Sequence, residues 1–106
     1  MRRPRVEILY FDGCPNHEAA RALVERVAAE LQAEPEIDLV EVPDADAAAQ
    51  LRFLGSPTVR VNGHDVEPGA EERGDFVFSC RVYRSERGLS GQLEANWVRK
   101  ALSEAA

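Results

Sequence analysis

The amino-terminal part of the chain changes from an apolar run to a helical repeat. Ile8-Leu9-Tyr10-Phe11 form a short apolar run, which is typical of a buried strand over about residues 5–11. The polar pair Asp12-Gly13 interrupts this run. Apolar residues then recur at helical spacing, and we expect a helix over about residues 15–33.

The next stretch again predicts a strand followed by a helix, and this helix is shorter. Ile37, Leu39 and Val40 predict a second strand over about residues 36–42, which Pro43 closes. Asp44 is a good N-cap for a short alanine-rich helix, because its carboxylate can accept a hydrogen bond from the first helical turn. This helix should end near Leu54-Gly55.

A hairpin is predicted where Val59-Arg60-Val61 meets Asn62-Gly63, a dipeptide typical of two-residue turns. Such a turn pairs Val61 with His64, Arg60 with Asp65 and Val59 with Val66. This register places the valines on one face of the hairpin and an opposite-charge pair on the other.

The remainder of the chain is less regular. Residues 67–74 are polar and predict a solvated loop, whereas the apolar residues 76–83 are compatible with an extended segment that has Phe78, Cys80 and Val82 on one face. Residues 85–91 form a second cluster of helix and strand breakers. A last helix should begin near Ser90 or Gly91, and its buried stripe would contain Leu93, Trp97, Val98, Ala101 and Leu102.

Composition narrows the classes of protein to which the chain can belong. A length of 106 residues with 44% hydrophobic and 30% charged residues predicts a single globular domain over residues 1–106. The net charge of −6 argues against nucleic acid as a partner, and no apolar run is long enough to cross a membrane. The basic start is too short and too charged for a signal peptide, so we expect a cytoplasmic protein.

Cys14 is the main candidate for chemistry. If Pro15 occupies the first helical position, Cys14 is the N-cap, and its sulfur faces unpaired N–H groups and the positive end of the helix dipole. This position favours the thiolate, which is the nucleophilic form. Asp12 acts in the opposite direction. His17 either stabilises the thiolate across the first turn, if it is protonated, or faces solvent.

The order strand-helix-strand-helix-strand-strand-helix (βαβαββα) resembles the thioredoxin fold, an α/β architecture. Cys14-Pro15-Asn16-His17 occurs where that family carries Cys-x-x-Cys or Cys-x-x-Ser, and Ser56-Pro57-Thr58 occurs where it carries a cis-proline. Leu89-Ser90-Gly91-Gln92-Leu93 is similar to the start of the family's last helix. The chain looks most like the small thioredoxin-like proteins of bacteria.

This resemblance implies a four-stranded mixed sheet flanked by three helices. It also implies that Pro57 is cis and close to Cys14, and that Ser56 presents its backbone to a substrate. His17 replaces the second cysteine of the motif, so a second thiol must come from elsewhere. Cys80 is the one candidate in the sequence, and we expect it to approach Cys14.

The resulting hypothesis is thiol–disulfide exchange without a cofactor, and whether the chain is an enzyme is left open. Cys14 would attack a disulfide, and Cys80 or glutathione would resolve the mixed disulfide. The partners would be protein or low-molecular-weight thiols and disulfides, with neither nucleic acid nor membrane involved. Three arginines could bind a carboxylate of glutathione, although exposure to solvent is the simpler alternative for them: Arg81, Arg84 and Arg87.

Other readings of the same residues stay open. Cys80 can equally be a small apolar residue packed in a strand. Cys14 and Cys80, with or without His17, could instead hold a soft ion such as mercury or copper(I), since soft ions prefer thiolates. A third alternative is a thioredoxin fold that serves only as a binding scaffold.

Overall fold

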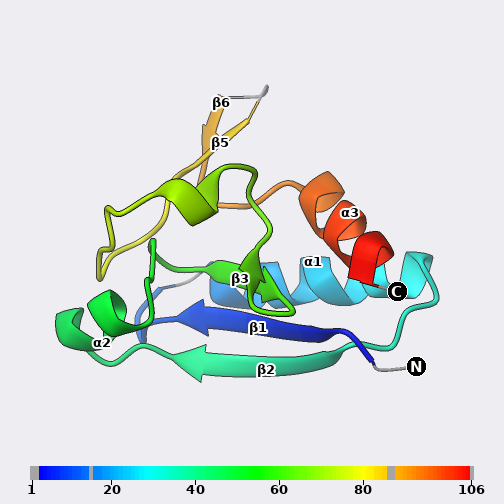
Figure 1. The fold of residues 1–106 in the computed structure, drawn as a ribbon, viewed down its shortest axis with the longest axis horizontal. Helices are drawn as coiled ribbons and strands as arrows, with labels where there is room; N and C mark the ends of the chain where they lie inside the picture. Colours follow the sequence, from blue (N-terminus) through cyan, green and yellow to red (C-terminus); the bar gives the residue numbers. More distant parts are fainter. Residues whose placement is uncertain (1–2, 15, 86–87, 106) are drawn as a thin grey trace.

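The fold is a mixed α/β arrangement, seen in a computed structural model that describes residues 3–14, 16–85 and 88–105. Within these residues a four-stranded sheet is accompanied by three α-helices, as expected from the sequence (Figure 1). The elements in chain order are β1 (Arg5–Tyr10), α1 (His17–Glu30), β2 (Glu36–Glu41), α2 (Ala45–Gln50), β3 (Thr58–Val61), β4 (His64–Asp65), the 3-10 turn η1 (Ala70–Glu72), β5 (Tyr83–Ser85), β6 (Gly88–Ser90) and α3 (Ala95–Ala105).

The main sheet has the strand order β2-β1-β3-β4. Strand β1 runs parallel to β2 and antiparallel to β3, so the sheet is mixed. The parallel pair is joined by α1, the kind of helical crossover that parallel strands require. Because β1 lies between two neighbours, Val6 and Ile8 are fully buried and Leu9 is nearly so.

The Asn62-Gly63 hairpin has the predicted register, with Val61 opposite His64 and Arg60 opposite Asp65. The two residues of this opposite-charge pair face each other, but each of them binds another partner. The Arg60 guanidinium donates to the carbonyls of Leu51 and Arg52 beyond α2, at 2.6 and 3.0 Å. Asp65 instead binds an arginine from a distant segment, described below.

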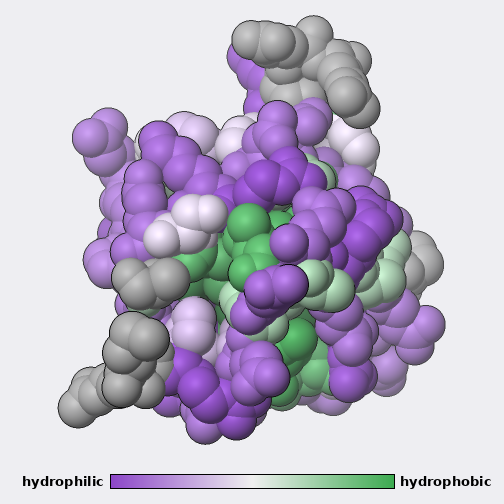
Figure 2. All heavy atoms as spheres, turned by 90° about the vertical axis from the view of Figure 1, so that its right-hand side faces the viewer, coloured by the Kyte–Doolittle hydropathy of each residue, from purple (hydrophilic) through white to green (hydrophobic). Residues whose placement is uncertain are grey.

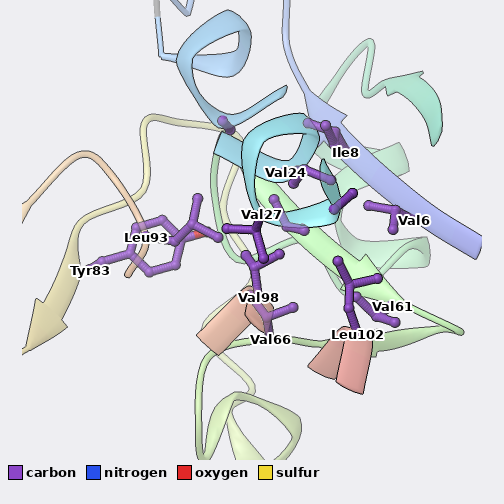
Figure 3. Packing of buried hydrophobic residues seen from close by; sticks show 13 residues of the cluster. Val6, Ile8, Val24, Val27, Val61, Val66, Tyr83, Leu93, Val98 and Leu102 are labelled. Atoms are coloured by element: carbon purple, nitrogen blue, oxygen red, sulfur yellow. The ribbon is translucent and has the colours of Figure 1, made fainter. Parts of the chain in front are cut away.

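Two apolar clusters cover opposite faces of the sheet, because successive residues of a strand point to opposite sides. The larger cluster joins Ile8 of β1 to α1 and α3 (Figure 3). The smaller cluster joins Leu9 of β1 to Ala48 of α2 and Phe53. The sequential neighbours Ile8 and Leu9 therefore tie both layers to the central strand.

The helices begin later than the sequence predicted. Helix α1 begins at His17 with Asn16 in the N-cap position, so Cys14 is not the N-cap; Pro15 lies outside the described residues. Helix α3 begins at Ala95 rather than near Ser90. In contrast, α2 begins as predicted, because the Asp44 carboxylate accepts a hydrogen bond from the Ala47 N–H at 2.8 Å.

A second, two-stranded sheet was not predicted. Strands β5 and β6 pair antiparallel and extend away from the main sheet (Figure 1). Breaker residues were interpreted as a loop here, yet Gly88 begins β6 with a φ of 104°, a conformation that favours glycine. The side chain of Tyr83 in β5 reaches the main core and lies beside Leu93 (Figure 3).

The burial of residues 76–83 excludes one of the two interpretations of Cys80. Cys80 is not a small apolar residue packed between Phe78 and Val82, because all three are exposed. Arg81 and Tyr83 are the buried side chains, with 2% and 1% of their surface exposed. The segment is therefore attached to the protein interior through Arg81 and Tyr83, and not through Phe78, Cys80 or Val82.

On the face of the molecule near α3, a group of hydrophobic residues is surrounded by hydrophilic residues (Figure 2). A hollow on the molecule is lined by residues from the hairpin and α3, including Val61, Val66, Trp97 and Ala101. Trp97 is only partly buried there, at the edge of the larger cluster. None of the helices in the described ranges combines the length and apolarity needed to span a membrane.

Candidate functional site

Two cysteines that are 66 positions apart in the sequence meet at one end of the sheet. Cys14 lies in the turn after β1, where its N–H donates to the carbonyl of Phe11. Cys80 lies in the segment between η1 and β5. Their Sγ atoms are 4.0 Å apart, with Cys80 as the donor, and neither cysteine is in a disulfide. The expected approach of Cys80 to Cys14 is confirmed.

The Cys14 sulfur is enclosed by protein. Only 2% of the residue surface is exposed, and the thiol donates to the carbonyl of Ser56 across 3.6 Å. The helix-terminal position predicted from the sequence is not what holds the sulfur. Its described partners are the Ser56 carbonyl and the Cys80 thiol.

His17, the first residue of α1, contacts the backbone of Cys14. Its Nδ1 lies 2.7 Å from the Cys14 carbonyl oxygen, and since a carbonyl only accepts, Nδ1–H is the donor. The ring also stacks on Tyr10 with centroids 4.3 Å apart. Among the hydrogen bonds of the described residues, His17 is joined to the carbonyl of Cys14 and not to its sulfur.

The Ser56–Pro57 peptide bond is cis, as expected, and the backbone of Ser56 borders both cysteines. Its N–H donates to the carbonyl of Ser79 at 2.8 Å, and its carbonyl accepts from the N–H of Arg81 at 2.9 Å. Ser56 and Cys80 thus form an isolated parallel bridge. The backbone that was expected to receive a substrate is bonded to the protein's own chain.

Arg81 anchors the segment that carries Cys80 (residues 76–83) through contacts in the protein interior. Its guanidinium donates to the Asp65 and Glu67 carboxylates at 2.8 and 2.7 Å, and to the Thr58 hydroxyl at 3.0 Å. It also lies over the ring of Tyr83, 4.4 Å from the centroid. Burial by itself lowers the pKa of Arg81, but Tyr83 and the two carboxylates more than compensate and raise it, so the guanidinium is charged.

This anchor was missed in the sequence, where Arg81 was one of three candidates for binding glutathione. Arg81 is committed to Asp65 and Glu67, Arg84 is exposed, and Arg87 lies outside the described residues. Asp65 and Glu67 follow the hairpin turn on alternate positions, so they share one side of the chain. These two carboxylates at alternate positions could have indicated a cation-binding site in the sequence. No local pattern, however, indicated that Arg81 is the bound cation.

The two thiols differ in their exposure to solvent. Cys80 is exposed, whereas Cys14 is buried. Desolvation raises the pKa of the Cys80 thiol, and the hydrogen bond to Cys14 and its charge raise it further. Cys80 therefore keeps its proton to higher pH than an ordinary thiol, which is consistent with its role as the donor between the two sulfurs.

The metal-binding capacity of the described residues is limited. Within the described ranges no group of three or more His, Cys, Asp or Glu side chains is arranged to hold a metal ion. The His64 imidazole bonds to the exposed Glu71 at 3.0 Å and not to either cysteine. A metal at Cys14 and Cys80 would have the two sulfurs as its protein ligands.

No family model and no curated protein matches this chain. Inferences about function therefore rest on the sulfur pair and its surroundings. Those surroundings are a cis-proline loop, a charged anchor and one buried and one exposed thiol.

Proposed function

We propose that this chain is a thioredoxin-like thiol–disulfide oxidoreductase in which Cys14 and Cys80 form the redox pair. The observation that carries the proposal is the separation of 4.0 Å between their Sγ atoms. A disulfide requires a distance of about 2.05 Å between sulfurs, so they must approach by roughly 2 Å. Cys80 is exposed and Cys14 is enclosed, so the Cys80 side chain is the one with room to move.

The proposed reaction transfers two electrons from the cysteine pair to an external disulfide. One cysteine thiolate attacks the disulfide R–S–S–R, forming a mixed disulfide and releasing one R–S⁻. The second cysteine, as thiolate, attacks the protein sulfur of that mixed disulfide and releases the other R–S⁻. The products are the Cys14–Cys80 disulfide and two thiols. The sequence-based hypothesis gives Cys14 the first attack and Cys80, or glutathione, the second.

Three features support a thioredoxin-like assignment. The mixed four-stranded sheet with three helices is compatible with that fold. The cis bond at Ser56–Pro57 lies beside the cysteine that follows β1. Helix α1 begins shortly after that cysteine. We further propose a cytoplasmic setting, because a reversible dithiol is most useful where thiol reductants keep cysteines reduced.

Mild oxidation followed by intact mass measurement tests this proposal. We expect a loss of two hydrogens and one linked peptide pair containing Cys14 and Cys80, reversed by a dithiol reductant. Cys80→Ser and Cys14→Ser are matched controls, and both should lose the linkage. If oxidation with glutathione yields only glutathionylated Cys14 and leaves Cys80 reduced, the two-thiol cycle is wrong and the protein acts as a monothiol.

The same sulfur pair favours a second candidate function, the binding of a soft metal ion. Two thiolates suit a two-coordinate ion such as copper(I) or mercury(II), because soft ions select sulfur ligands. Catalytic reduction of a small disulfide, with many turnovers per protein, supports the oxidoreductase. Stoichiometric metal uptake without turnover supports the carrier, and the absence of both leaves the fold as a binding scaffold.

A further inference from the structure

We infer that external thiols and disulfides meet the protein at Cys80 rather than at Cys14, and that they are small molecules rather than extended peptides. This inference rests on the proposed redox pair and specifies its substrate class and the order of exchange. It reverses the order expected from the sequence, in which Cys14 meets the substrate first.

The first support is the difference in access between the two sulfurs. Cys14 exposes 2% of its surface, and its sulfur lies between the Ser56 carbonyl and the Cys80 thiol. Cys80 is exposed to solvent. Thiol–disulfide exchange needs the attacking sulfur to reach the attacked one along an open path. An incoming molecule therefore reaches Cys80 without moving the protein.

The second support is that the backbone beside the pair is already occupied. Peptides that dock in extended form add to unpaired N–H and C=O groups at a sheet edge. At Ser56 the N–H is bonded to Ser79 and the carbonyl to Arg81. An extended peptide can pair with Ser56 only by displacing residues 79–81. A small molecule needs no such pairing.

The third support is that residues 79–81 are held firmly in this place. Arg81 is bonded to two carboxylates and a hydroxyl in the interior, and the Tyr83 hydroxyl donates to the carbonyl of Pro57. Gly55 packs so closely that an added Cβ would lie 2.8 Å from the Arg81 Cα. Removing the segment would take the Arg81 cation away from the Asp65 and Glu67 side chains, which are 6% and 12% exposed. Glu67 keeps its contact with Arg73 at 3.4 Å, but Asp65 loses its paired charge, which is unfavourable.

The exchange then follows a definite course. A small thiolate R–S⁻ attacks the Cys80 sulfur of the Cys14–Cys80 disulfide, so that bond breaks and a Cys80–S–S–R bond forms. Cys14 takes the electron pair and leaves as a thiolate. A second R–S⁻ attacks the sulfur of R and releases R–S–S–R, while Cys80 leaves with its electron pair and takes a proton. The exposure of Cys80 and the enclosure of Cys14 favour the first step in this direction.

Mapping the first mixed disulfide tests this order. The oxidised wild-type protein is mixed with a limited amount of glutathione, quenched in acid at short times, and digested. We expect the glutathione mass on the Cys80 peptide in excess of about tenfold over the Cys14 peptide, which corresponds to a barrier difference of about 1.4 kcal/mol. Earliest adducts on Cys14 would overturn the inference. An absence of any Cys14–Cys80 disulfide would instead overturn the proposed redox pair.

Single-cysteine variants provide a second measurement. Cys14→Ser keeps only Cys80, and Cys80→Ser keeps only Cys14; each is treated with glutathione disulfide in native buffer and in urea. We expect native Cys14 to be slowed relative to its unfolded rate far more than native Cys80, by about tenfold or more. Equal protection of the two thiols would contradict the inference.

Substrate size is tested with two disulfides. Reduction of hydroxyethyl disulfide by the wild-type protein should exceed reduction of a cystine-linked extended peptide by about tenfold or more in kcat/KM. Equal rates, or faster reduction of the peptide, would show that the backbone at Ser56 opens to extended substrates.

Discussion

The sheet with its helices and the segment over residues 76–83 are held in place by different forces. In the first region, Val6, Ile8, Val24 and Val98 have no exposed surface and pack on one another. In the second region, Val77 and Val82 are 44% and 58% exposed, while Arg81 is 2% exposed. Burial of apolar surface organises the sheet, whereas a charged cluster organises the segment that carries Cys80.

This difference bears on the candidate site, because one cysteine belongs to each region. Cys14 follows the central strand β1, where its N–H donates to the carbonyl of Phe11. Cys80 is next to Arg81 and is fixed by the ion pairs with Asp65 and Glu67. The distance between the sulfurs is therefore set by a polar anchor. Variants can weaken that anchor without removing apolar contacts of the sheet.

The largest effect is expected for Arg81→Met, which removes the anchor's charge. The Asp65 side chain, 6% exposed, then loses its paired cation, whereas Glu67 keeps its contact with Arg73 at 3.4 Å. Breaking a buried ion pair in this way costs about 3–5 kcal/mol. Urea unfolding measures the loss of stability, and oxidative linkage of Cys14 with Cys80 should fall with it. The exposed Arg84→Met is the matched control and should change stability by less than about 0.5 kcal/mol. A neutral Arg81→Met would show that the segment is placed by other contacts.

Gly55→Ala tests the same anchor from the opposite side. Gly55 has a φ of 116°, and its added Cβ would lie 2.8 Å from Cα and Cβ of Arg81. Overpacking of this kind costs about 1–3 kcal/mol, and we expect an increased rate of Cys14 alkylation because the segment is pushed outward. Gly74→Ala is the control, since its Cβ would meet nothing within 4 Å. Unchanged Cys14 reactivity in Gly55→Ala would contradict this account.

A smaller effect is expected for His17→Phe, at the first residue of α1. The phenyl ring keeps the stacking on Tyr10 but loses the hydrogen bond to the Cys14 carbonyl. The loss of one such bond costs about 0.5–1.5 kcal/mol, measurable by urea unfolding. His64→Phe, at a position with a side chain 79% exposed, is the control and should be closer to neutral. A stability loss equal in both variants would mean that the carbonyl contact of His17 adds nothing.

The most subtle prediction concerns the titration of Cys80, followed by the pH dependence of its alkylation. Desolvation, the hydrogen bond to Cys14 and the charge of Cys14 raise the pKa of Cys80. In the wild-type protein the midpoint should lie above that of a model thiol. Cys14→Ser removes the contribution of the Cys14 charge, so the midpoint should move down. An unchanged midpoint would mean that desolvation alone determines the pKa.

Local sequence patterns determined much of the sheet and its helices. Strand β1, strand β2, the Asp44-capped helix α2 and the hairpin register follow from apolar periodicity, capping and turn chemistry, which act between residues close in sequence. The starts of α1 and α3 were predicted too early, since the helices begin at His17 and Ala95.

Only the tertiary structure decided how the Cys80 segment is placed. Its apolar alternation was compatible with Cys80 on a buried face, but Arg81 is turned inward toward Asp65 and Glu67, and the neighbouring Cys80 is exposed. The approach of Cys80 to Cys14 was expected only from the resemblance to thioredoxins. The physical reason is that ion pairs and backbone bridges act between chain positions far apart in sequence, where no periodic pattern records the partner.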